Sequence, residues 1–289
     1  MKKKLQQLTP FFIIGNPRSG TTLLRLMLNQ HDEIVVPPEC GFSVWLSDQF
    51  ADKNFFSDGI KFDFAAQVVK SRKFETWGVD ERELKDFLQH QECNSYKDAV
   101  LAIYLFYALK RGRSPSLIGD KNNYYINHLE KIDVLFGSPK YVFIVRDGRD
   151  VACSYLALQA VGITSQYSPR LPGEINEIAK EWIANNAKII SYLEEYAERS
   201  LLIKYEDLIG FPGRELERVC EFFQIEYQPK MLGYYENSDE PDDFLIWKKK
   251  VLSPPDPANF GMYKRLLSAE EIMTFQRLAE DTLSYFGYS

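Results

Sequence analysis

The chain has 289 residues, of which 45% are hydrophobic and 26% charged, which suits one large or two small globular domains with a sizeable core. Its formal net charge of −6 excludes the global basic field of a nucleic-acid-binding protein, so any anion site must be local. No segment is apolar for 18 residues and the apolar run at 11–14 is too short for a secretory signal, so we expect a cytoplasmic protein without a membrane span.

The first predicted elements are a strand, a glycine-containing loop and a helix. Residues 11–14 form a short apolar run of β-forming residues, which ends at a Gly-Asn-Pro sequence. Apolar residues then recur at helical spacing across residues 22–30. Residues 42–110 are predicted to be mainly helical, with loops near 52–58 and 72–78 and a buried helix at 99–109.

The remainder of the chain alternates between strands and helices. We expect strands at 117–119, 140–145 and 201–205, and helices at 127–136, 150–161, 174–199, 213–223 and 268–286. Ser268 and Glu271 form a capping box at the start of the last helix. Residues 165–173 are predicted as a loop and residues 233–259 as irregular chain. This alternation predicts a parallel sheet covered on both faces, with ligands at the carboxyl ends of its strands.

The first chemical motif is the loop 15–22, Gly-Asn-Pro-Arg-Ser-Gly-Thr-Thr, between a predicted strand and helix. Gly20 allows backbone amides to approach an anion, and the start of the helix supplies unpaired N–H groups and the positive end of a dipole. Further donors are the side chains of Arg18, Ser19, Thr21 and Thr22. The loop resembles a Walker A motif, but position 21 is Thr where a nucleotide triphosphatase has Lys, which argues against a magnesium–nucleotide site.

Two further motifs follow predicted strands. Arg146 comes directly after the strand at 140–145, and Ser154 lies eight residues later in a predicted helix, so both can converge on one anion. A salt-bridge cluster at the end of a strand explains Arg146 equally well. Tyr205 begins the sequence Tyr-Glu-Asp-Leu at 205–208 and can stack on a base or bond a ring nitrogen, but taken alone it is better explained as the end of a strand beside a solvated acidic pair.

Together these motifs resemble the PAPS-dependent sulfotransferase family, in which PAPS is 3′-phosphoadenylyl sulfate. Residues 17–24 are similar to the family's 5′-phosphosulfate loop, Arg146 with Ser154 to its 3′-phosphate motif, and 205–208 to the segment whose tyrosine lies by the adenine. Residues 262–268, which include Lys264, are a weaker match to a C-terminal stretch that contacts the nucleotide. The loop is most similar to tyrosylprotein-sulfotransferase-like and bacterial members.

The resemblance implies one sulfotransferase domain over residues 1–289, with a P-loop-type central parallel sheet flanked by helices on both faces and a helical insertion on the acceptor side at about 41–116. It also implies that PAPS is the donor, that PAP is the product and that no metal is needed. The sequence departs from the cytosolic small-molecule branch, which has a Lys-x-His motif, because Lys121 is followed by two Asn. A mechanism based on His is therefore not expected.

Sulfuryl transfer requires a base for the acceptor hydroxyl and positive charge for the leaving phosphate. Glu39 is the candidate base, because a short connection from the first helix can return it to the mouth of the loop, where partial burial would raise its pKa. Arg18 and Lys121 are the candidates for stabilising charge. A surface Glu and a solvated loop Lys are the plain alternatives for Glu39 and Lys121.

The acceptor is a hydroxyl compound that the sequence does not identify, and the oligomeric state is equally open. We predict that the pocket for the acceptor is walled by residues 41–110, 165–173 and 233–258. The aromatic residues in these ranges would suit a phenol or a lipid, but they would equally suit a bulky core. The negative net charge argues slightly against an acidic peptide unless a local basic groove exists. Two competing hypotheses are a P-loop kinase or NTPase and a non-catalytic nucleotide-binding protein.

The remaining cysteines and histidines suggest no further chemistry. The four cysteines, Cys40, Cys93, Cys153 and Cys220, are far apart in sequence, so we expect buried free thiols in a reducing compartment. The three histidines, His31, His90 and His128, do not cluster and receive no role.

Overall fold

The computed structural model describes residues 5–161, 166–236, 238–246 and 248–288. Within these residues five parallel strands form one sheet in the order β2-β3-β1-β4-β5. The strands are β1 (Thr9–Gly15), β2 (Ile34–Val35), β3 (Leu117–Lys121), β4 (Lys140–Val145) and β5 (Ser200–Lys204). Each of these strands except β2 was predicted from the sequence.

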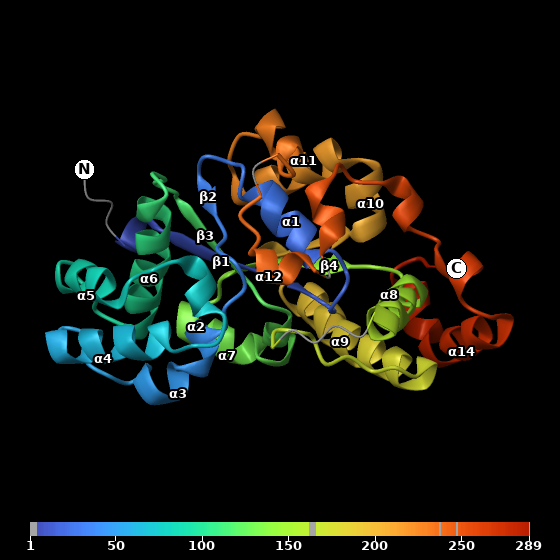
Figure 1. Ribbon diagram of the computed structural model, residues 1–289, viewed down its shortest axis with the longest axis horizontal. Helices are drawn as coiled ribbons and strands as arrows, with labels where there is room; N and C mark the ends of the chain where they lie inside the picture. The colour runs from blue at the N-terminus through green and yellow to red at the C-terminus, as the bar shows by residue number, and fades with distance from the viewer. Residues whose placement is uncertain (1–4, 162–165, 237, 247, 289) are drawn as a thin grey trace.

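The central strand β1 presents apolar side chains to both faces of the sheet. Phe12 and Ile14 pack into a core with residues of α6 (Tyr96–Lys110), α7 (Leu129–Phe136) and α9 (Ile175–Glu195). Phe11 and Ile13 pack into a second core with α1 (Thr21–Leu28), α10 (Tyr205–Gly210) and α11 (Pro212–Phe223). Figure 1 shows α1, α10 and α11 on one side of the sheet and α7 and α9 on the other. This arrangement confirms the predicted α/β fold with helices on both faces.

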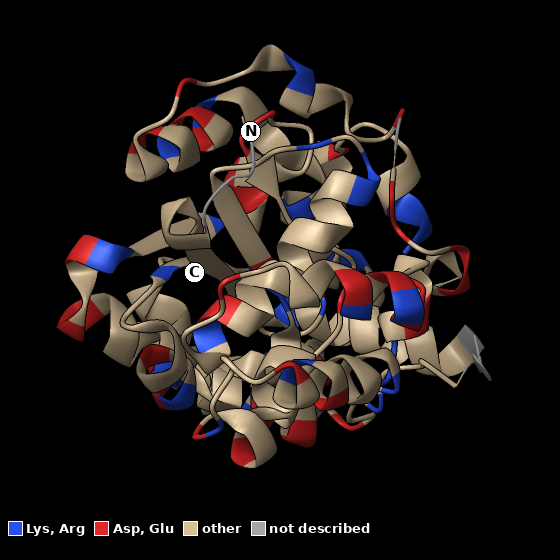
Figure 2. Cartoon of the chain, turned by 90° about the vertical axis from the view of Figure 1, so that its left-hand side faces the viewer, with Lys and Arg blue, Asp and Glu red and all other residues tan. Residues whose placement is uncertain are grey.

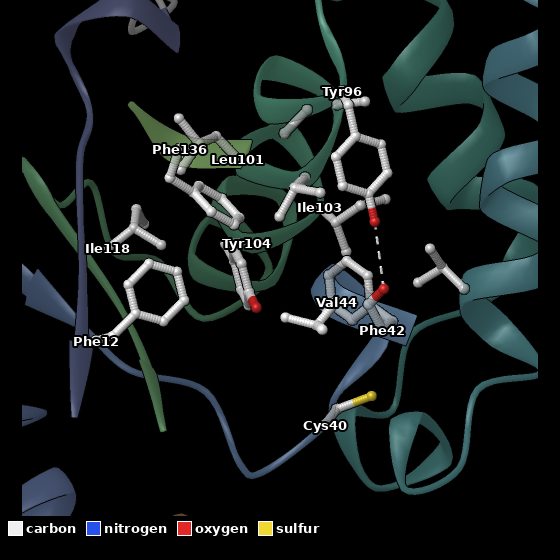
Figure 3. Close-up of a cluster of buried hydrophobic side chains, with 14 of the residues drawn as sticks. Phe12, Cys40, Phe42, Val44, Tyr96, Leu101, Ile103, Tyr104, Ile118 and Phe136 are labelled. Carbon is white, nitrogen blue, oxygen red and sulfur yellow. Dashed lines mark hydrogen bonds between the residues drawn. The ribbon is translucent and has the colours of Figure 1, made fainter. Parts of the chain in front are cut away.

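The chain between β2 and β3 is helical. It forms α2 (Phe42–Trp45), α3 (Ser47–Phe50), α4 (Asp58–Val69), the 3₁₀ helix η2 (Phe74–Trp77), α5 (Glu81–Gln89) and α6. Figure 3 shows Phe12 of β1 in one buried cluster with Tyr104 and Phe42 of this part, and the rings of Tyr104 and Phe42 lie side by side. The Tyr96 hydroxyl donates to the Phe42 carbonyl at 3.3 Å. Many of the aromatic residues noted in the sequence therefore belong to a bulky core.

The helices after β3 are η3 (Asn123–Asn127), α7, α8 (Gly148–Val161), α9, η4 (Ala197–Arg199), α10, α11, η5 (Pro229–Gly233), α12 (Asp242–Leu245), η6 (Lys249–Leu252), η7 (Pro257–Asn259), α13 (Tyr263–Leu266) and α14 (Ala269–Tyr285). The predicted capping box of Ser268 and Glu271 is present at α14.

Several elements differ in detail from the sequence prediction. Tyr205 is the first residue of α10 and not the last of a strand, because its side chain turns into the core beside Gly20. The long helix ends at Glu195, before the separate 3₁₀ turn η4. The described part of 233–259 contains the short helical turns α12, η6 and η7, so it is less irregular than predicted.

The structure also shows the state of the cysteines and the distribution of surface charge. The four cysteines are buried free thiols, as predicted. Acidic and basic residues are interspersed over the outer helices (Figure 2). In the described part of the chain, no helix is both long enough and apolar enough to cross a membrane.

Candidate functional site

A cavity of about 1470 Å³ opens at the carboxyl ends of the strands. The residues that follow β1, β4 and β5 line it, as does Lys121, the last residue of β3. Parallel strands end at the same edge of a sheet, which is where α/β proteins bind their ligands. The cavity therefore gathers motifs that lie more than 100 residues apart in sequence.

The loop between β1 and α1 has the backbone of an anion-binding turn. Arg18 and Gly20 both have left-handed φ angles, of 69° and 94°, and α1 begins at Thr21 directly after Gly20. A Cβ atom on Gly20 would lie 2.4 Å from the Tyr205 ring, so only glycine fits there. Ser19 is buried, and its hydroxyl has no hydrogen-bond partner among the described residues. A buried donor in this position suits a bound anion.

Two guanidinium groups meet beside this loop. The Arg18 Nε donates to the Ser154 hydroxyl at 2.9 Å, and the Arg146 Nη1 donates to the Arg18 carbonyl at 3.2 Å. The Arg146 guanidinium also lies over the Tyr205 ring, 4.5 Å from its centroid. Burial, followed by the charge of Arg146, lowers the pKa of Arg18 to about 10. Two like charges held this close favour an anion between them.

The C-terminal part of the chain fixes Arg146 from the other side. Its Nη2 donates to the Asn259 carbonyl at 2.8 Å and lies 4.0 Å from an Asp150 oxygen. The Asp150 carboxylate accepts hydrogen bonds from the backbone N–H groups of Gly261 and Tyr263, at 2.7 Å and 2.9 Å. Asp150 therefore joins α8 to the start of α13, and its carboxylate already accepts hydrogen bonds from backbone donors.

Glu39 lines the same cavity as the guanidinium pair and lies between two lysines. Lys121 Nζ is 2.7 Å from one carboxylate oxygen and Lys73 Nζ is 2.5 Å from the other. Burial disfavours the ionised carboxylate, but the positive charges of Lys121, Lys73 and Lys248 outweigh that effect and hold the pKa of Glu39 well below its usual range. The expected raised pKa was wrong, because the sequence did not reveal the surrounding lysines.

Lys121 follows a buried carboxyl group in the sequence of β3. Its neighbour in β3, Asp120, accepts hydrogen bonds at one oxygen from the hydroxyls of Ser43 at 2.9 Å and Tyr125 at 2.8 Å, and also from Tyr104. Burial raises the pKa of Asp120 to about 6, despite these hydrogen bonds. The cluster fixes the end of β3 and thereby the position from which Lys121 reaches Glu39.

A further charged wall comes from the segment around α12. Glu240 is buried and pairs with the Arg25 Nη2 of α1 at 2.6 Å, and it also pairs with Lys248. Burial opposes ionisation of Glu240, but the charges of Lys248 and Arg25 lower its pKa to about 2. Burial lowers the pKa of Lys248 to about 8. The ion pair of Arg25 with Glu240 thus connects this wall to α1, the helix that follows the loop at residues 15–22.

Another part of the cavity wall, in contact with α12, is the described part of the loop predicted at 165–173. Ser165 lies outside the described residues, but residues 166–171 line the cavity. The Arg72 Nη2 donates to the Gln166 carbonyl at 2.6 Å, and the rings of Tyr167 and Phe244 meet edge to face with centroids 5.3 Å apart. The three segments predicted as acceptor walls therefore all contribute residues to the cavity.

Most of the candidate residues line this one cavity. They are Arg18, Gly20, Thr21, Thr22, Glu39, Lys121, Arg146, Ser154 and Tyr205. Ser19 is a buried member of the loop and does not line the cavity. Lys264 is exposed on α13 and does not line the cavity either, although Met262 just before α13 does. Lys73 and Lys248 also line the cavity, and the sequence analysis missed both because no local pattern marks them.

The cavity is basic although the whole chain is acidic. Lys and Arg at nine positions line it, against three Asp or Glu. The cationic residues are Arg18, Arg72, Lys73, Lys121, Arg146, Arg170, Lys248, Lys249 and Lys250. The local basic site expected from the sequence is therefore present, and the net charge of −6 no longer argues against an acidic acceptor.

Comparison with known proteins was made by sequence and by structure. A family model described as "Sulfotransferase family" matches residues 10–229. Protein-tyrosine sulfotransferase A of Caenorhabditis elegans is 24% identical over 229 residues, which cover 78% of this chain and 53% of that protein. Nodulation protein NoeE of Sinorhizobium fredii is 24% identical over 299 residues, which cover 96% of this chain and 65% of that protein. The chain thus spans between about half and two thirds of the length of these relatives.

Solved structures share the fold. The sulfotransferase domain from the curacin biosynthetic pathway has a TM-score of 0.61 at 22% identity, covering 95% of this chain and 97% of that one. Mouse sulfotransferase SULT7A1, solved in complex with PAP, has a TM-score of 0.51 at 12% identity, covering 96% of this chain and 87% of that one.

Proposed function

The chain belongs to the sulfotransferase family, and from that premise we propose that it transfers a sulfuryl group from PAPS to an acceptor hydroxyl. One observation carries the proposal. The guanidinium pair of Arg18 and Arg146 and the carboxylate–lysine pair of Glu39 and Lys121 line the same cavity, beside a glycine-containing loop at a helix start. The first pair suits a phosphorylated donor, and the second suits the activation of a hydroxyl.

The residues present fit such a donor. The Ser19 hydroxyl and the Arg146 Nε are buried without a hydrogen-bond partner among the described residues, and both are donors. Gly20 leaves the loop open to close approach by a phosphate. The structural relative from mouse was solved with PAP, which supports the same nucleotide for this chain.

We assign the parts of the donor to residues as follows. Arg18, Ser19, Gly20, Thr21 and Thr22 would hold the 5′-phosphosulfate end, since they form the loop and the first turn of α1. Arg146 and Ser154 would hold the 3′-phosphate, and the Tyr205 ring would lie by the adenine. PAPS supplies the activated sulfuryl group. The exposed position of Lys264 gives no support to its predicted contact with the nucleotide.

Glu39 is proposed as the general base. It would take the proton of the acceptor hydroxyl onto a carboxylate oxygen as the hydroxyl oxygen attacks sulfur, while the bond between sulfur and the 5′-phosphate oxygen of PAPS would break and release PAP. Its low pKa keeps it ionised at neutral pH, at the cost of a weaker driving force for proton transfer. Lys121 and Arg18 would stabilise the negative charge that develops during an in-line transfer. No metal is required in this proposal.

The acceptor belongs to one of four hydroxyl classes: small molecule, glycan, lipid or peptide tyrosine. The protein-tyrosine sulfotransferases among the relatives make a tyrosine peptide the first acceptor to test. The basic cavity is compatible with acidic residues around that tyrosine. A cytoplasmic location and a single domain over 1–289 stay predictions from the sequence.

A thermal-shift titration tests the donor assignment. PAP should raise the melting temperature without added metal, because a ligand that binds only the folded state stabilises it by mass action. Stabilisation by ATP with Mg²⁺ alone would favour a P-loop kinase or NTPase instead. PAP binding without transfer from PAPS to any acceptor would favour the non-catalytic alternative.

A further inference from the structure

Lys73 contacts Glu39, although it lies 34 residues further along the chain. The two lysines take one carboxylate oxygen each, so that Glu39 is held between Lys73 on Oε1 and Lys121 on Oε2. The side chains of Lys73 and Glu39 are 16% and 17% exposed, which makes this pair more protected from solvent than an ordinary surface salt bridge.

The backbone at Lys73 is strained. Its φ angle is 74°, in the left-handed region that non-glycine residues seldom adopt. Its carbonyl accepts hydrogen bonds from the Thr76 backbone N–H at 3.1 Å and from the Thr76 hydroxyl at 2.7 Å, which fixes the start of η2. Its ammonium group also lies 5.3 Å from the centre of the Phe244 ring. Strain of this kind persists where the surrounding structure holds a residue in place, often at a functional site.

The charged groups around Glu39 come from several segments. Lys121 comes from β3, Lys73 from the turn before η2, and Lys248 from the chain after α12, with Glu240 behind it. Asp120 lies beside Lys121 in β3. Lys121 already has the proposed task of stabilising charge on the transferred group, and Lys248 is paired with Glu240. Two lysines of the described residues lie within salt-bridge distance of Glu39, and of these Lys73 has no task in the proposed reaction.

We propose that Lys73 is a positioning residue for the general base, holding one oxygen of Glu39 in place while Lys121 serves the transferred group. This inference rests on the proposed function, because it gives Lys73 a role through Glu39. It assigns Lys73 no contact with the acceptor. The observation that favours positioning over acceptor binding is that the ammonium group is already engaged by the Glu39 carboxylate and the Phe244 ring.

The test compares Lys73→Met with Lys73→Arg, and uses Lys70→Met as a matched control. Lys70 is an exposed lysine three residues earlier, at the end of α4. For each variant, PAP binding is measured by calorimetry, and kcat and the acceptor KM are measured against pH with PAPS and the acceptor that the wild type uses.

We expect Lys73→Met to lower kcat by roughly tenfold or more, with the PAP affinity unchanged and the acceptor KM nearly so. Loss of a nearby cation raises the pKa of Glu39, so the acid limb of the pH profile should move up by about one pH unit or more. Lys73→Arg should restore most of the activity, and Lys70→Met should behave as the wild type. An unmoved acid limb, or a raised acceptor KM at unchanged kcat, would overturn the inference.

A stability measurement separates failure of this inference from failure of the proposed function. Melting temperatures are compared for Lys73→Met, Glu39→Gln and the double variant. A direct interaction makes the two single effects non-additive. If the wild type transfers no sulfate but the effects are non-additive, the proposed function fails and the Lys73–Glu39 contact stands. Additive effects would refute the contact whatever the activity.

Discussion

The partners of Arg146 are mainly uncharged groups, whereas a salt-bridge cluster at the end of a strand would surround it with carboxylates. It contacts the Arg18 carbonyl, the Asn259 carbonyl and the Tyr205 ring, and its nearest carboxylate oxygen is 4.0 Å away. Carbonyl groups and an aromatic ring carry no net negative charge, so they do not neutralise the guanidinium, which can still bind an external anion. At this scale the geometry favours the phosphate-binding hypothesis for Arg146 over the salt-bridge alternative.

Replacement of Arg146 by alanine should weaken PAP binding by roughly tenfold or more, because a charge-assisted contact to phosphate is lost. Isothermal calorimetry with PAP measures the change. Arg82→Ala, at an exposed arginine on α5, is the control and should leave the affinity unchanged. An unaltered affinity for Arg146→Ala would remove the 3′-phosphate assignment.

Asp120 makes the stability of the protein depend on pH in the opposite sense to Glu39. Because its folded pKa is raised to about 6, it contributes stability that is fully present below its unfolded pKa of about 3.9 and is lost as the pH rises through 6. Asp120→Asn stays neutral throughout. The free energy of unfolding of this variant relative to wild type should therefore increase between pH 4 and pH 7, by up to about 3 kcal/mol.

Urea unfolding of both proteins at pH 4 and pH 7 measures this difference. The comparison between variants cancels the carboxylates that titrate in the other direction, such as Glu240. A difference that is the same at both pH values would show that Asp120 is not the titrating group.

The conformation of the loop at residues 15–22 depends most on Gly20, where there is no space for a side chain. Gly20 combines a left-handed backbone with a contact to Tyr205, the first residue of α10, so the loop and the end of β5 constrain each other. Tyr205 begins a helix one residue earlier than its β-forming pattern predicts, and its ring packs against this loop.

Gly20→Ala should reduce PAP binding by more than tenfold and lower the melting temperature, because the added Cβ would both strain the backbone and strike the Tyr205 ring. Gly112→Ala is the matched control. Gly112 also has a positive φ, of 69°, but nothing lies within 4 Å of an added Cβ. The Gly112→Ala substitution should lower the free energy of unfolding only by the backbone strain, about 1–2 kcal/mol, and leave PAP binding unchanged. Equal effects of the two substitutions would contradict this account.

Local patterns in the sequence predicted the elements that have local causes. The apolar run at 140–145, the loop at 15–22 and the capping box of Ser268 are each recognisable within a few residues. The strand β2 was missed because its two residues are too few to show a period. Lys121 was predicted as a residue of the same site, but Lys73 was missed because no local pattern marks it and it lies 34 residues further along the chain than Glu39.

Over the whole molecule, charge is divided between an acidic exterior and a basic cavity. The chain carries a net charge of −6, while its cavity is lined by nine cationic and three acidic residues. A polyanion such as PAP is thus attracted to the cavity but not to the surface in general.

The affinity for PAP should fall several-fold when the salt concentration rises from about 50 to 300 mM, because salt screens the attraction between the phosphates and the cationic residues that line the cavity. Adenosine, which lacks phosphates, provides the control and should bind with nearly the same affinity at both concentrations. Equal salt dependence of the two ligands would mean that the cavity charges do not attract the phosphates.

The ion pair between Arg25 and Glu240 has a consequence for protein engineering. Arg25 is fully buried on α1, whereas its carboxylate partners Asp239 and Glu240 belong to the segment that we propose as a wall of the acceptor pocket. Exchanging that segment for one from a relative, as a way to change acceptor choice, would leave the buried guanidinium without these carboxylates unless the new segment also carries an acid there. The segment is therefore not freely interchangeable: a successful graft must bring its own partner for Arg25 or replace Arg25 as well.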